Sequence, residues 1–70
     1  MSFRGARRAA GLSVRQVADA LQVSHVAVYY WETGKQQPRA SKLRSIATLY
    51  GVTVDELLAA GPEEEQEDEV

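Results

Sequence analysis

The sequence predicts an all-α fold, a compact domain of five short helices followed by a disordered acidic tail. Apolar residues recur at the three- and four-residue spacing of amphipathic helices, and no segment alternates apolar and polar residues for long enough to form a strand. Small polar residues and glycines recur where helix caps are expected. The 70 residues are enough for one domain at most.

The first two helices are predicted from composition and caps. Residues 2–10 are rich in Arg and Ala and form the first helix, which Gly11 ends. Ser13 and Gln16 have the spacing of a capping box, so the second helix begins directly after Ser13. Three residues form its apolar face: Val17, Ala18 and Leu21.

The third helix is expected over about residues 25–33. Ser24 is its N-cap, and Gly34 is the left-handed residue that ends it. A polar loop follows over residues 35–39 and contains Pro38.

Two more helices complete the domain. The fourth is expected over about residues 41–50 and ends at Gly51; its apolar residues are Leu43, Ile46, Ala47 and Tyr50. Thr53 and Glu56 have capping-box spacing at the start of the fifth helix. Three residues of this helix are expected to close the core: Val54, Leu57 and Leu58.

Charge divides the chain into two parts. Residues 1–62 hold all eight Lys and Arg and four of the ten acidic residues, which gives a net charge of +4, whereas residues 63–70 hold the other six acids and no base. Gly61 and Pro62 separate the predicted domain, residues 1–62, from this tail, which we expect to be disordered because it has one apolar residue. The tail has two interpretations, a solubilising end or a DNA mimic that competes for the basic domain.

Several function classes are excluded by composition. There is no cysteine and one histidine, so we expect no metal site and no cofactor. No nucleophile–base pair or phosphate-binding glycine loop indicates an enzyme. No apolar run is long enough to cross a membrane, and no secretory signal is present, so the cytoplasm is the expected location.

The third predicted helix has two different faces. At about 100° per residue, one arc holds Ala27, Val28, Trp31 and Glu32, and the other holds His25, Val26, Tyr29, Tyr30 and Thr33. Tyrosines in a small helical protein usually pack in the core. Tyr29, Tyr30 and Trp31 cannot all face inward, so we assign Trp31 to the core and the tyrosines to the surface. The outer face is suited to a DNA major groove.

A longer set of residues resembles a known family. The set comprises Leu12-Ser13, Gln16-Val17-Ala18, Val23-Ser24, Val28, Glu32, Gly34, Pro38, Ile46-Ala47, Gly51-Val52 and Leu57-Leu58. Its spacing is similar to that of the lambdoid phage repressor and Cro family of helix-turn-helix regulators, also called the xenobiotic-response-element family. The resemblance covers about residues 3–58 and implies a lambda-repressor-like fold.

The resemblance implies a role for each helix of the motif. The second helix lies across the DNA backbone, and the third enters the major groove and contacts base edges. Base contacts are then expected from His25, Val26 and Tyr30, with Tyr29 beside them. Phosphate contacts are expected from helix ends and polar or basic side chains, although Arg and Lys also coat any soluble surface. The candidates are Arg4, Arg8, Arg15, Gln16, Thr33, Lys35, Arg39, Ser41 and Lys42, with the backbone of Gly34.

The resemblance also implies an ion pair between Arg7 and Glu32 that fixes the third helix against the first. Two positions depart from the family pattern. Val14 replaces a glutamine that contacts phosphate, so that contact falls to Arg15 or Gln16. Gln22 replaces a glycine in the turn, where a left-handed residue costs about 1 kcal/mol.

We therefore expect a sequence-specific regulator of transcription that binds double-stranded DNA, acts as a repressor, and is encoded by a bacterium or phage. A homodimer on a palindromic operator is expected because one small module buries little DNA surface; its seam would include Leu49, Val54 and Leu58. The alternative is a protein-interaction module, such as an antitoxin that binds a partner protein.

Overall fold

A computed structural model describes residues 2–60; Met1 and residues 61–70, including the predicted acidic tail, lie outside the described part. The described residues form five helices and no strand, which confirms the predicted fold class. The helices are α1 (Phe3–Ala9), α2 (Val14–Leu21), α3 (His25–Thr33), α4 (Ala40–Tyr50) and α5 (Val54–Ala60).

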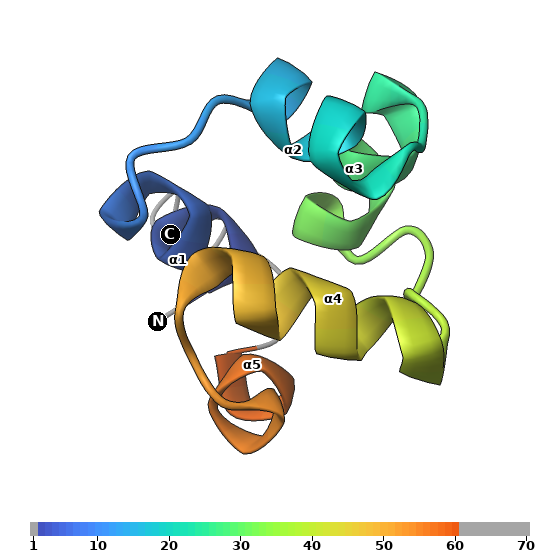
Figure 1. The fold of residues 1–70 in the computed structure, drawn as a ribbon. Coiled ribbons are helices and arrows are strands. Elements are labelled where there is room, and N and C mark those ends of the chain that lie inside the picture. The colour runs from blue at the N-terminus through green and yellow to red at the C-terminus, as the bar shows by residue number, and fades with distance from the viewer. Residues whose placement is uncertain (1, 61–70) are drawn as a thin grey trace, which may run out of the picture.

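The helices are arranged around α4. In Figure 1, α2 and α3 lie together at one end of the molecule, and α5 lies at the other, with α4 between them. Helix α1 contacts α3, α4 and α5, so it ties the two ends together. None of the helices within residues 2–60 combines the length and hydropathy that crossing a bilayer requires.

Side-chain caps fix the starts of several helices as the sequence predicts. The Ser13 hydroxyl accepts from the Gln16 amide nitrogen at 3.0 Å, and the Gln16 side-chain oxygen accepts from the Ser13 amide at 2.8 Å. Thr53 and Glu56 make the same reciprocal pair, at 3.0 and 2.9 Å, before α5. These capping boxes satisfy amide groups that the first turn of a helix cannot pair internally.

Helix α4 begins one residue earlier than predicted. Arg39 is its N-cap and makes no side-chain cap hydrogen bond. The Leu43 amide donates to the Arg39 carbonyl at 2.8 Å, which closes the first turn and makes Ala40 the first helical residue. Ser41, the expected first residue, therefore lies inside the helix.

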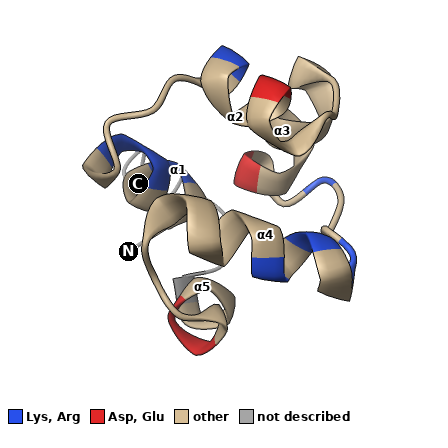
Figure 2. Cartoon of the chain, in the orientation of Figure 1, with Lys and Arg blue, Asp and Glu red and all other residues tan. Residues whose placement is uncertain are grey.

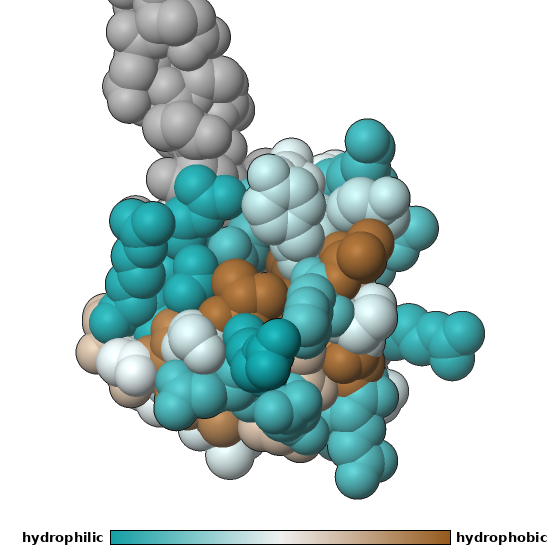
Figure 3. Space-filling model, turned by 90° about the horizontal axis from the view of Figure 1, so that it is seen from above, coloured by the Kyte–Doolittle hydropathy of each residue, from teal (hydrophilic) through white to brown (hydrophobic). Residues whose placement is uncertain are grey.

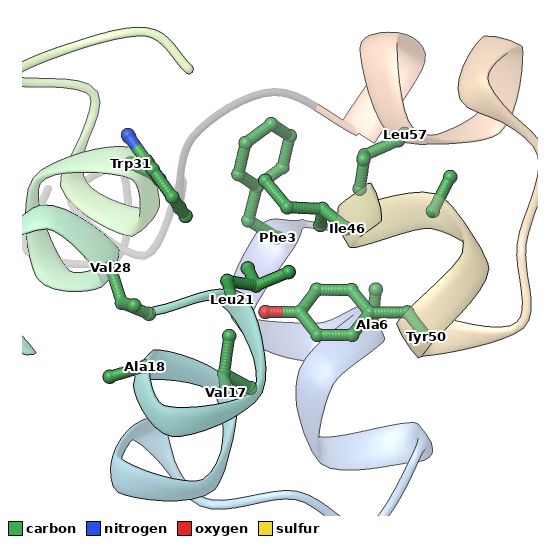
Figure 4. Close-up of a cluster of buried hydrophobic side chains, with 11 residues drawn as sticks. Phe3, Ala6, Val17, Ala18, Leu21, Val28, Trp31, Ile46, Tyr50 and Leu57 are labelled. Atoms are coloured by element: carbon green, nitrogen blue, oxygen red, sulfur yellow. The ribbon is translucent and has the colours of Figure 1, made fainter. Parts of the chain in front are cut away.

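The core draws side chains from all five helices (Figure 4). Its buried apolar members are Phe3, Ala6, Val17, Ala18, Leu21, Val28, Trp31, Ile46, Ala47, Tyr50 and Leu57. The predicted apolar face of α2 is confirmed in full, and Leu43 of α4 is only half-buried. Placing Leu58 in the core was wrong, because it is 57% exposed. Leu57 faces the core, and the next residue lies about 100° further round the helix.

Candidate nucleic-acid interface

The connection between α2 and α3 sets the angle at which α3 is presented. Gln22 has φ 58°, the left-handed conformation that the family pattern assigns to a glycine. The Val23 amide donates to the Ala18 carbonyl at 3.0 Å, closing the end of α2. The Ser24 hydroxyl then accepts from the Ala27 amide at 3.1 Å and starts α3, as predicted. Two helices joined by this tight turn form a helix-turn-helix.

The two faces of α3 differ as the angular pattern predicts. Val28, Trp31 and Glu32 are buried against the rest of the domain, and Ala27 is half-buried. On the other face, Val26 is 53% exposed and Tyr29 is 56% exposed. His25 and Thr33 are also exposed, and Tyr30 is half-buried. The inner face therefore attaches α3 to the domain, and the outer face is available to a partner.

Glu32 is held in place by two arginines of α1. The Arg7 Nε atom donates to Glu32 Oε2 at 2.6 Å, and Arg7 Nη2 lies 3.4 Å from Glu32 Oε1. Arg4 Nε donates to the same Oε1 atom at 3.3 Å. Arg7 makes a third hydrogen bond, from Nη1 to the Leu12 carbonyl at 2.9 Å, which ties the guanidinium to the α1–α2 connection. This cluster fixes α3 to α1, because a carboxylate buried this deeply needs both charge and hydrogen-bond partners.

The pKa of Tyr50, on α4, is shifted by burial and by the charges of the same cluster. Burial, reinforced by the negative charge of Glu32, raises the pKa of Tyr50 to about 12, while Arg7 acts in the opposite direction. The raised pKa keeps the phenol neutral well above pH 10, and the ring is part of the core between α1 and α4 (Figure 4).

The C-terminal end of α3 carries a hollow of about 410 Å³, lined by Tyr29, Tyr30, Thr33, Gly34 and Lys35. The Lys35 ammonium lies 5.5 Å from the centre of the Tyr30 ring, within the range of a cation–π contact. The Thr33 hydroxyl donates to the Tyr29 carbonyl at 3.0 Å, and the Lys35 amide donates to the Tyr30 carbonyl at 2.9 Å. The hollow thus combines aromatic walls, a left-handed glycine and one cation.

Most of the basic side chains proposed for phosphate contact are exposed. Arg8 of α1, Arg15 of α2, and Lys35 and Arg39 of the α3–α4 connection all lie on the surface. Figure 2 shows Lys and Arg on α1, α2, the α3–α4 connection and α4, and acidic residues on α2 and α3 as well as on α5 at the far end. The chain segment after α3, with Lys35 and Arg39, is therefore basic, as a polyanion partner requires, whereas on α2 the exposed Asp19 offsets Arg15.

The remaining phosphate candidates have contacts within the domain. Arg4 binds Glu32, as described above, and the Lys42 Nζ atom donates to the Leu21 carbonyl at 3.3 Å, which caps the end of α2. The side-chain oxygen of Gln16 serves the capping box and leaves its amide NH₂ group to donate. Ser41 is exposed in the first turn of α4, and its carbonyl accepts from the Ser45 hydroxyl at 3.4 Å.

Sequence reasoning missed two features of this site. The first is Arg4 on Glu32, which the three-residue spacing of Arg4 and Arg7 on one helix face could have indicated. The second is Arg44, which is exposed on α4 and lines a separate hollow of about 460 Å³ with Gln22 and Lys42. No local pattern marks Arg44, because only the packing of α4 against α2 brings it beside the turn.

Comparison with known proteins agrees with the motif that the geometry defines. Residues 2–60 match a family model described as a helix-turn-helix domain. The chain therefore belongs to the helix-turn-helix domain family, which confirms the resemblance found in the sequence.

Two curated relatives are similar to this chain. The HTH-type transcriptional activator BcrR of Enterococcus faecalis is 40% identical over 53 residues, which cover 76% of this chain and 26% of that protein. The HTH-type transcriptional regulator DdrOP3 of Deinococcus deserti is 36% identical over 56 residues, covering 80% of this chain and 43% of that protein. The chain thus spans less than half the length of either relative. No solved structure gives a significant match.

Proposed function

We propose that this chain is a sequence-specific, double-stranded DNA-binding regulator of transcription that inserts α3 into the major groove. The observation that carries the proposal is the asymmetry of α3. Its inner face is buried and tied to α1 through Glu32, while its outer face exposes His25, Val26 and Tyr29. A nine-residue helix held this firmly at one face is built to present the other to a partner.

The dimensions of α3 suit a major groove. A helix with its side chains is about 10–12 Å across, and the groove of B-DNA is about 12 Å wide. Residues near the N-terminus of such a helix contact base edges in helix-turn-helix complexes. We assign base contacts to His25, Val26, Tyr29 and Tyr30, and phosphate contacts to the exposed basic side chains that flank them. Binding, not catalysis, is the proposed activity.

The names of both relatives support a role in transcription, because one is a transcriptional activator and the other a transcriptional regulator. One of them, BcrR, is an activator, whereas we expect this chain to be a repressor. Repression remains our proposal, because a domain bound to an operator within a promoter blocks that promoter by occupying it. A reporter gene placed behind the selected operator measures the direction, and a fall in expression is the result that repression predicts.

We further propose that two copies bind a palindromic site. One module of this size buries only about 600–1,000 Å² on DNA, so two linked half-sites are needed for tight binding. Leu58 of α5 is an exposed apolar side chain suited to a seam, and Leu49 and Val54 are half-buried beside the core. Half-sites separated by one helical turn, about 34–36 Å, are the expected arrangement.

The decisive test is binding of the full chain to duplexes selected from a random library, measured at increasing salt. The logarithm of the affinity should fall steeply and linearly with the logarithm of the salt concentration, since each neutralised phosphate releases counterions. The substitution Lys35→Gln should reduce that slope by about one while base preference is kept. If no duplex binds even at low salt, the outer face serves a protein partner, as in an antitoxin, and the proposal fails.

A further inference from the structure

Two large apolar side chains are exposed side by side on the outer face of α3. Val26 is 53% exposed and Tyr29 is 56% exposed. Residues three apart on a helix are neighbours, with Cβ atoms about 5–6 Å apart. Val26 and Tyr29 are together called the methyl-contact pair. Both lie in the first five residues of α3, the part of such a helix that meets base edges.

The chemistry of Val26 narrows what this pair can contact. Its side chain has only methyl groups and cannot form a hydrogen bond with any base edge. In the major groove, the apolar group presented by a base is the C5 methyl of a pyrimidine. A valine exposed at the second position of α3 therefore packs well against a methyl group. Against a polar base edge it would leave that edge without a hydrogen-bond partner.

We propose that the methyl-contact pair selects operators by packing against pyrimidine C5 methyl groups, so that methylation of the base edge is a main determinant of specificity. This inference rests on the proposed function. The inference extends that function by naming the chemical group that α3 recognises. Thymine carries this methyl in ordinary DNA, and 5-methylcytosine presents the same group at a G·C pair.

The surroundings of the pair favour DNA over a protein partner. Seen from the α2–α3 end, hydrophobic surface occurs only as small patches between hydrophilic side chains (Figure 3). Exposed apolar patches that mark protein–protein contact sites are usually larger, on the order of several hundred Å². Arg15, Lys35 and Arg39 are exposed on the segments before and after α3, which complements phosphates on either side of a groove.

The size of the effect follows from the burial of one methyl group. Removing one CH₂-sized group from water is worth about 0.8 kcal/mol, which corresponds to about a fourfold change in affinity. The Val26 side chain forms no hydrogen bond that could offset the loss of the contact with the methyl group. Single-methyl changes in the duplex should therefore be measurable in a binding titration.

The experiment uses the full chain and the tightest duplex selected from a random library, in which each thymine is replaced in turn by deoxyuridine. At one or more positions, loss of the C5 methyl should weaken binding about fourfold. In the variant Val26→Ala the same replacement should have a smaller effect than in the unmodified chain, because the methyl has lost one of its two contacts. Tyr29→Phe should keep the full methyl dependence, since the ring and not the hydroxyl makes the contact, and Tyr29→Ala should reduce it.

The matched control is Thr48→Ala, which truncates an exposed β-branched side chain on α4 that is assigned neither to DNA contact nor to the dimer seam. It should leave the ratio of affinities for the thymine and deoxyuridine duplexes unchanged. Circular dichroism melting of each variant establishes that it is folded, as expected for exposed side chains. A second arm replaces cytosines of the duplex by 5-methylcytosine. A gain in affinity there identifies methylated cytosine as a source of the group, and no gain assigns recognition to thymine alone.

Two results would overturn the inference while leaving the proposed function intact. One is a selected duplex in which no deoxyuridine replacement changes affinity. The other is a methyl dependence that persists at full size in both Val26→Ala and Tyr29→Ala. Failure to select any duplex at all would instead remove the proposed function.

Discussion

The two faces of α3 contain similar residue types but have different roles. The inner face holds a valine, a tryptophan and a glutamate, all at most 8% exposed, whereas the outer face holds a valine and two tyrosines. Position around the helix, not hydrophobicity, decides which residues stabilise the fold and which remain available. Substitutions on the inner face should therefore change stability, and substitutions on the outer face should change binding alone.

The largest expected effect is the loss of the inner carboxylate. Glu32→Gln leaves Arg7 buried without its counter-charge and should destabilise the domain by about 3–5 kcal/mol. Urea denaturation followed by tryptophan fluorescence measures this directly. Asp19→Asn, which also removes one negative charge but at an exposed site of α2, should change stability by less than about 0.5 kcal/mol. Equal stability of Glu32→Gln and the unmodified chain would show that the cluster does not hold α3.

Two valines of α3, one on each face, allow the effects of the two faces on stability to be compared within one helix. Val28→Ala removes a side chain that is 1% exposed and should cost about 2–3 kcal/mol of stability. Val26→Ala, two residues earlier, should change stability by less than about 0.5 kcal/mol. Denaturation midpoints measure the difference at constant m-value. Similar losses in the two variants would contradict the division of α3 into two faces.

High pH should lower the stability of the domain, because Tyr50 in the core ionises. The folded pKa of about 12 lies above the ordinary value of 10.0, so the folded state holds the phenolic proton more tightly than the unfolded state. The resulting stabilisation is complete below pH 10 and is lost as the pH rises toward 12, by on the order of 1–2 kcal/mol. Between pH 9 and 11.5, the unmodified chain should lose more stability than Tyr50→Phe; equal losses would assign the change to other groups.

The smallest expected effect lies in the turn that orients both faces. Gln22 is in the left-handed conformation with φ 58°, which glycine adopts without a steric cost. Gln22→Gly should raise stability by about 0.5 kcal/mol, because relief of about 1 kcal/mol of strain exceeds the added entropy of the unfolded chain. A differential scanning calorimetry comparison measures the shift. A lower melting temperature would mean that the Gln22 side chain makes a contact worth more than the strain.

Local chemistry explains why much of this fold could be predicted from the sequence. The reciprocal pairing of Ser13 with Gln16 requires residues only three apart, so its geometry is fixed by spacing alone. The two faces of α3 follow equally from the pitch of one helix. Even the approach of Arg7 to Glu32, 25 residues apart, was implied by the family resemblance.

Contacts that depend on packing between helices could not be predicted in the same way. Lys42 reaches the Leu21 carbonyl only because α4 crosses the end of α2, and a backbone acceptor leaves no trace in the sequence. Leu58 was expected in the core because an apolar pattern cannot show where the neighbouring helices end. The contact of Lys35 with the Tyr30 ring likewise depends on the path of the chain after Gly34.

The most direct test of the central claim is selection from a random duplex library with the double variant His25→Ala and Tyr30→Ala, in parallel with the unmodified chain. His25 is exposed and Tyr30 half-buried on the outer face, so the variant should remain folded by circular dichroism. We predict that the two proteins select different sequences, because α3 provides the base contacts. Recovery of the same sequences with the same preference would contradict the base contacts assigned to His25 and Tyr30.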